Sequence, residues 1–206
     1  MLVVNPDSVG RPNLMARSSV IREPGELPLV ATIVVPMGPV QRRAVERIDA
    51  EDFSSVLKKV RAERQERGLS TDDAYLKRGE RALRQYHVVA ILDPRNEHAI
   101  SDTLDPFWHA QILHTRQYAR FCDETMGHFI HHEPLDHADV DAVAHLRRLY
   151  PYTCARITEI FGGAIESEFF PNPVPDERLV CRHCQCFNEA LLAETTYAQV
   201  FSCQSH

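Results

Sequence analysis

The chain has 206 residues, 44% of them hydrophobic and 25% charged, a composition that suits a folded domain with a hydrophobic core. Its formal net charge of -6 argues against nucleic-acid binding, because phosphates require a basic surface. No apolar run approaches the roughly 20 residues of a membrane-spanning helix, and the N-terminus lacks a signal-peptide pattern. We therefore expect a cytoplasmic protein without nucleic-acid or membrane partners, whose six cysteines are reduced or metal-bound.

The first 26 residues are rich in proline, serine, glycine and arginine, which predicts a flexible N-terminal arm. The β-branched segment 27–36 has prolines near both ends and predicts one short strand, whose pairing partner is left open. Helices are expected after it. Pro39 suits the first turn of a helix that runs to about residue 48, a second helix ends at Gly68, and a third ends before Asp93-Pro94.

The Asp105-Pro106 pair is typical of a helix start, and Gly127 of a helix end, so one helix is expected from residue 105 to residue 126. On that helix His109 and His114 point in different directions. Residues 128–134 lie between a helix stop and a proline and should be extended, so that His128 and His132 share one face and His131 lies on the other.

A further helix is expected from about residue 136, restarted or kinked at Pro151 and ended by Gly162-Gly163, and the proline-containing residues 164–180 predict a linker. The expected fold is therefore mainly α, with one short N-terminal strand and a cysteine-rich C-terminal tail. Its parts are a flexible arm (1–26), a helical domain with a histidine-rich site (27–163), and a linker with a metal-binding tail (164–206).

Histidines are concentrated between residues 104 and 137, where six of the eleven lie: His109, His114, His128, His131, His132 and His137. Imidazole is the commonest metal ligand in proteins. A metal centre would take His109, one or two of the histidines at 128, 131 and 132, and a carboxylate from Asp105, Glu133 or Asp136. Two histidines with one carboxylate suit iron, and three histidines suit zinc or copper. The alternative is that these are exposed loop histidines and that His114 is a core residue.

Three further thiols lie close together near the C-terminus, at Cys181, Cys184 and Cys186. The first two have the Cys-x2-Cys spacing of zinc sites, and the fourth ligand would be Cys203, His183 or His206. Thiolates also bind copper(I) and iron–sulfur clusters, and an unliganded or redox-active thiol cluster is the other interpretation. Cys122 and Cys154 are expected to be small core residues.

The segment 86–134 resembles the bacterial glycine-rich domain-containing protein-like family, in the pattern D-x-x-W-H-x-x-I-L-x-T-x-x-Y, then F-C, then G-x-F-I-H-H-x-P. The residues that carry it are Asp105, Trp108, His109, Ile112, Leu113, Thr115, Tyr118, Phe121, Cys122, Gly127, Phe129, Ile130, His131, His132 and Pro134. The family pattern has a second histidine where this chain has Gln111, which leaves open whether His114 replaces it. The resemblance implies a mostly helical domain centred on this segment and no particular reaction.

Three functions are compatible with these patterns. The first is a metal-dependent enzyme, an iron or copper oxidoreductase or tailoring enzyme acting on a small molecule or a peptide. His109, His131 and His132 would bind the metal, Asp105 would be a ligand or orient one, and His128 would be a spare ligand or a general base. The second is a non-catalytic module whose cysteine tail (Cys181, Cys184, Cys186 and Cys203) binds zinc and docks a protein partner. A copper-handling or thiol-redox protein is a third possibility.

Overall fold

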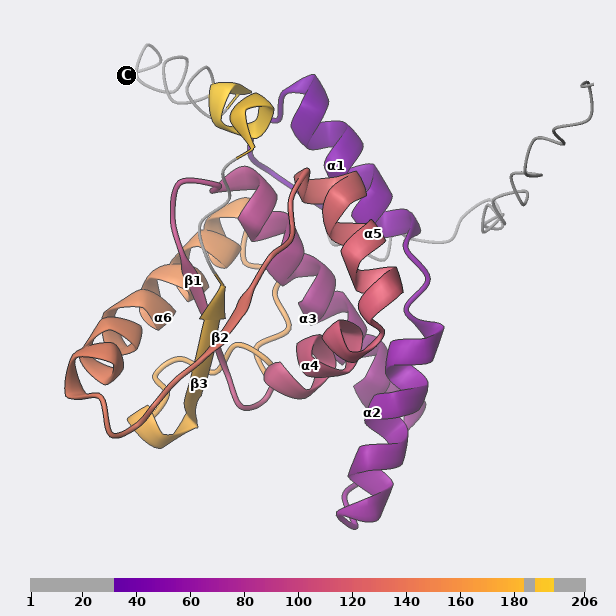
Figure 1. The fold of residues 1–206 in the computed structure, drawn as a ribbon, viewed down its shortest axis with the longest axis vertical. Helices are drawn as coiled ribbons and strands as arrows, with labels where there is room; N and C mark the ends of the chain where they lie inside the picture. Colours follow the sequence, from indigo (N-terminus) through magenta and orange to yellow (C-terminus); the bar gives the residue numbers. More distant parts are fainter. Residues whose placement is uncertain (1–31, 184–187, 195–206) are drawn as a thin grey trace, which may run out of the picture.

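The computed structural model describes residues 32–183 and 188–194, and helices make up most of this part of the chain (Figure 1). The helices are α1 (Pro39–Ala50), α2 (Ser54–Glu66), α3 (Asp73–Leu92), α4 (Asp105–Leu113), α5 (Thr115–Met126), α6 (Val140–Phe161) and the 3-10 helix η1 (Asp176–Arg178). The strands are β1 (His98–Ser101), β2 (His132–Pro134) and β3 (Leu179–His183). The mainly α class expected from the sequence is confirmed.

The three strands form one small antiparallel sheet in the order β1-β3-β2. The last strand in the chain therefore lies in the centre, between two strands that precede it. Figure 1 shows α6 on one side of this sheet and α3, α4 and α5 on the other. His183 in β3 is paired with His98 in β1 and with His132 in β2, so three histidines lie side by side across the sheet. Residues directly opposite one another on neighbouring strands have side chains on the same face.

Helix α3 is the central element of the core, and every residue from Ala82 to Leu92 is buried. It begins where the Asp72 carboxylate accepts a hydrogen bond from the Tyr75 amide at 2.6 Å. Arg84 is buried within the core, where its guanidinium bonds the carbonyls of Ile48 and Glu51 and pairs with Glu80. These bonds satisfy a buried charge and hold α3 against the end of α1.

Helix α6 has a cap at each end. The Asp139 carboxylate accepts from the amides of Asp141 and Ala142 at 3.0 Å each, and Gly162 ends the helix in the left-handed conformation, with φ of 59°. The helix does not restart at Pro151, one of the two expected alternatives, because α6 continues through this exposed proline. None of the described helices is both long and apolar enough to cross a bilayer.

The strand expected at 27–36 is not formed by its described part, residues 32–36. These residues are tied to α6 instead, through a hydrogen bond of 2.9 Å from the Val34 amide to the Ile160 carbonyl. Residues 27–31 of that prediction lie outside the described residues. The linker expected at 164–180 is also wrong, because Phe169 and Phe170 are buried in the core and β3 begins at Leu179.

The single helix expected from residue 105 to residue 126 is two helices. They meet at His114, which has φ of -86° and ψ of 58° and therefore interrupts the helical backbone. Its Nδ1 lies 2.8 Å from the Ala110 carbonyl oxygen. The end of α5 at Gly127, with φ of 75°, is as expected.

Gly79 lies in the middle of α3, where a Cβ atom would approach Cζ of Phe107 to 2.0 Å. We predict that Gly79→Ala lowers the free energy of unfolding by about 1–2 kcal/mol, because overpacking outweighs the roughly 1 kcal/mol gained in helix propensity. Urea denaturation measures the change. In a Phe107→Leu background the same substitution should become neutral or stabilising. A Gly79→Ala protein more stable than the wild type would refute this view of the α3–α4 contact.

Candidate metal centre

Asp105, His132 and Cys181 lie together at the junction of α4 with the sheet. The Nε2 atom of His132 is 2.9 Å from Oδ1 of Asp105, and the Cys181 thiol donates to the same oxygen at 3.2 Å. One potential ligand atom from each of the three lies within 4.8 Å of the others. A nitrogen, an oxygen and a sulfur ligand thus converge from parts of the chain that are far apart in sequence.

Each of the three side chains is directed by the element that carries it. Asp105 is the first residue of α4, His132 is the first residue of β2, and Cys181 is in the middle of β3. Since His132 is paired with His183, it lies diagonally across from Cys181 on the same face of the sheet. The antiparallel register of β2 and β3 therefore brings the Cys181 thiol and the His132 imidazole together beside α4.

Trp108 and Tyr118 hold the segment that carries His132. The Trp108 ring packs against the His132 ring with centroids 4.9 Å apart, and its Nε1 donates to Oη of Tyr118 at 3.2 Å. The Tyr118 hydroxyl in turn donates to the Ile130 carbonyl at 2.7 Å. Both of these hydrogen bonds are buried, so they fix the path of the strand that lies beside α4.

The electrostatics of the three groups are coupled. Burial tends to raise the pKa of Asp105, but hydrogen bonds from His132 and Cys181 outweigh it, so the pKa lies below its usual value. Burial, together with the negative charge of Asp105, raises the pKa of the Cys181 thiol well above its usual value. Without a cation the site therefore holds a carboxylate and a protonated thiol.

His109 lies next to this cluster. It follows Asp105 by one helical turn and is exposed, and its ring centroid is 5.8 Å from that of His132. Its charge also contributes to the lowered pKa of Asp105. The predicted ligand His109 is therefore near the cluster, although its nitrogens are not among the three converging atoms.

His131 and His128 lie apart from the three converging side chains. The expected alternation holds for residues 130–132: Ile130 is buried and His132 faces Asp105, whereas His131 is exposed and packs against Phe129, with ring centroids 5.0 Å apart. His128 is half-buried just after α5, with Nδ1 3.2 Å from the Met126 carbonyl oxygen.

Cys181 was expected in the C-terminal thiol site, but it is a buried residue of the central strand. Cys184, Cys186 and Cys203 lie outside the described residues, as does His206. Cys122 and Cys154 are buried in helices and form no disulfide, as expected for core residues.

Two histidines outside the 104–137 cluster form a second polar group, in which His183, expected only as a possible ligand of the C-terminal thiol site, lies beside His98. His98 and His183 are fully buried on neighbouring strands, with ring centroids 5.2 Å apart. His183 shares a hydrogen bond of 2.9 Å with the Tyr86 hydroxyl, and Nε2 of His98 lies 3.4 Å from the Asp93 carboxylate. Only the pairing of β1 with β3 brings these residues together, so no local sequence signal marks them.

One family model matches residues 42–168, more than half of the chain, and its description is UCP032817-like. The chain belongs to the UCP032817-like family. The resemblance to the glycine-rich domain-containing protein-like family is therefore wrong, although the residues on which it was based do build the junction of α4, α5 and β2. None of the curated proteins and none of the solved structures matches the chain.

The free energy of unfolding should depend on pH through the buried residue His87. Burial lowers its pKa to about 4, although a hydrogen bond of 2.8 Å links its Nε2 to Oε1 of Gln111. Since the unfolded chain takes up this proton near pH 6.5, stability should be lost as the pH falls from about 6.5 to about 4, by up to about 3 kcal/mol.

We predict that His87→Gln, which keeps a partner for Gln111, reduces the slope of unfolding free energy against pH in this window. Chemical denaturation between pH 4 and pH 7 measures it. Val88→Ala removes a neighbouring buried side chain and should lower stability at every pH without changing the slope. An unchanged slope in His87→Gln would show that other groups cause the dependence.

Proposed function

We propose that this protein binds a zinc ion through Asp105, His132 and Cys181. The observation that carries the proposal is the convergence of three different ligand types within 4.8 Å. A thiolate, an imidazole and a carboxylate together are ligands for zinc, whereas magnesium and calcium prefer oxygen ligands alone.

The polar contacts within the cluster support this proposal. The hydrogen of the Cys181 thiol now lies between the sulfur and the Asp105 carboxylate. A divalent cation placed among the three ligands would take over the role of this hydrogen, because it neutralises the carboxylate and stabilises the thiolate. Zinc binding at neutral pH should therefore release a proton from Cys181.

His109 is the fourth ligand in this proposal. It lies at position i+4 from Asp105 on α4, and ligands with this spacing reach one ion from the same face of a helix. Its exposed side chain is not held by the core, so it can turn toward the ion. A site with four protein ligands is closed, as is usual for structural zinc.

The role that we assign to the ion is to fasten the sheet to α4. Strand β2 has only three residues, and β3 follows a long segment that contains only one 3-10 turn. An ion shared by α4, β2 and β3 would tie these elements together at one point. The Cys181 thiol must be reduced to serve as a ligand, which agrees with the cytoplasmic location expected from the composition.

A metal-dependent oxidoreductase acting on a small molecule or a peptide is the second candidate. Its support is that His109, His132 and Asp105 supply the two histidines and one carboxylate typical of non-haem iron enzymes, on a side of the molecule where His109 is exposed. Buried Cys181 beside the same carboxylate favours zinc over iron.

We predict that the full chain, purified without a histidine tag, binds one zinc ion that depends on this cluster. Asp105→Asn, His132→Gln and Cys181→Ser should each weaken binding by on the order of 100-fold, and binding should raise the melting temperature. Calorimetric titration in buffers of different ionisation enthalpy measures both the affinity and the released proton. His131→Gln, which alters the adjacent exposed histidine, is the matched control and should bind as the wild type does.

The cysteines at 184, 186 and 203 can bind metal as well, so the titration is repeated with all three replaced by serine. Zinc binding that survives this replacement and is lost with Asp105→Asn supports the proposed site. Zinc that is lost with the three serines and unaffected by His132→Gln refutes it and supports the C-terminal thiol site. Iron or copper in the purified protein, lost with His132→Gln, would favour the oxidoreductase.

His109 has a separate test. If it completes a closed site, His109→Ala should weaken zinc binding by about tenfold and change the visible spectrum of the cobalt-substituted protein, which reports the coordination number. An unchanged affinity and spectrum would mean that solvent occupies the fourth position, as in catalytic zinc sites.

A further inference from the structure

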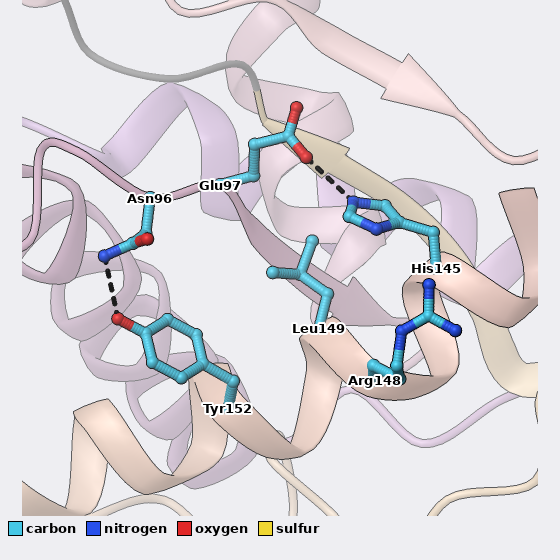
Figure 2. Close-up of a pocket in the computed structure, with 6 residues that line it drawn as sticks. All are labelled: Asn96, Glu97, His145, Arg148, Leu149 and Tyr152. Carbon is cyan, nitrogen blue, oxygen red and sulfur yellow. Dashed lines mark hydrogen bonds and ion pairs between the residues drawn. The ribbon is translucent and has the colours of Figure 1, made fainter.

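A hollow of about 360 Å³ lies between α6 and the segment that leads into β1 (Figure 2). Its lining residues are Asn96, Glu97, His145, Arg148, Leu149 and Tyr152. Figure 2 shows Asn96 and Tyr152 at one end of the hollow, His145 and Arg148 at the other, and Leu149 between them. The volume is at the lower end of the range for small-molecule sites.

This hollow is independent of the candidate metal centre. Glu97 is bonded by Arg182, whose position in β3 lies between those of Cys181 and His183. Successive side chains of a strand point to opposite faces, so Arg182 and Glu97 lie on the face away from Asp105. A ligand here would not touch the proposed zinc ligands.

The apolar part of the hollow is held in place before any ligand arrives. The Tyr152 hydroxyl donates to Asp93 at 2.5 Å and accepts from Asn96 at 2.9 Å. Its ring stacks on the buried His98 ring, with centroids 5.7 Å apart and an angle of 10° between the planes. Together with the side chain of Leu149, this ring offers a rigid apolar surface, which reduces the entropy lost on binding.

The charges around the hollow are paired with one exception. Glu97 is bonded by His145 at 2.8 Å and by Arg182 at 3.0 Å. Arg148 is exposed and makes no hydrogen bond or ion pair with another residue of the described part of the chain. Among the described residues, Arg148 is therefore the one charged group lining the hollow that has no partner, whereas Glu97 shares Arg182 with Glu133. A guanidinium binds a carboxylate through two parallel hydrogen bonds.

We propose that this hollow binds a small carboxylic acid with an aromatic or apolar body. The body packs on Tyr152 and Leu149, and the carboxylate pairs with Arg148. The Arg148 guanidinium lines the hollow together with the Glu97 carboxylate. This arrangement favours a ligand with one negative charge over a phosphate, because a second negative charge would have no partner there. One aromatic ring with a short acidic chain fits the volume.

The test uses 3-phenylpropionate and its uncharged amide as probes of equal shape, titrated into the full chain at pH 7 and followed by amide NMR. We expect saturable shifts confined to residues 96–97 and 145–152, a dissociation constant in the millimolar range, and at least tenfold tighter binding of the acid than of the amide. Intermolecular NOEs from the probe ring to Leu149 and Tyr152 should accompany them.

Arg148→Gln should remove the preference for the acid. Arg147→Gln is the matched control, since Arg147 is the preceding residue of the same helix, is also exposed and pairs with Asp176 outside the hollow. It should leave both affinities unchanged. Equal affinities for acid and amide in the wild type, an undiminished preference in Arg148→Gln, or shifts scattered over the surface would each overturn the proposal.

Discussion

The pairing of β3 between β1 and β2 is the interaction on which the rest of the structure depends. It brings Cys181 to Asp105 and His132, it places His183 beside His98, and it directs Arg182 to Glu97 on the opposite face. One short strand thus supplies a residue to the candidate metal centre and a neighbour to the acid-binding hollow. If β3 were removed, the metal centre and the hollow would each lose a contact, because successive residues of this strand point to opposite faces of the sheet.

Helix α3 provides the support behind this sheet. Tyr86 donates to the His98 carbonyl at 2.9 Å and bonds His183, while His87 reaches Gln111 in α4. These buried hydrogen bonds fix the orientation of the sheet and of α4 more narrowly than apolar packing alone would. The candidate metal centre therefore lies between two elements that the same helix positions.

The sequence predicted the helices well because their signals are local. The stop at Gly127, the end of α3 before Asp93-Pro94 and the end of α6 at Gly162 each depend on residues within one turn of the helix. It also named Asp105 and His132 as candidate ligands, and these two side chains lie 2.9 Å apart. The break at His114 was missed because the residues on both sides favour a helix and only the packing of α4 and α5 separates them.

What the sequence determined by itself was the helical class, most helix ends, and the segment that carries Asp105 and His132, two of the three side chains of the candidate metal centre. What only the tertiary structure decided was which of those side chains meet. Cys181 was expected in a site with Cys184, which lies outside the described residues, and the structure places it beside Asp105, 76 residues earlier in the chain. The strands have three to five residues, too few for a periodic pattern, and their register depends on long-range pairing. Ligands brought together by such pairing leave no mark in local sequence, so the site had to be found in the fold.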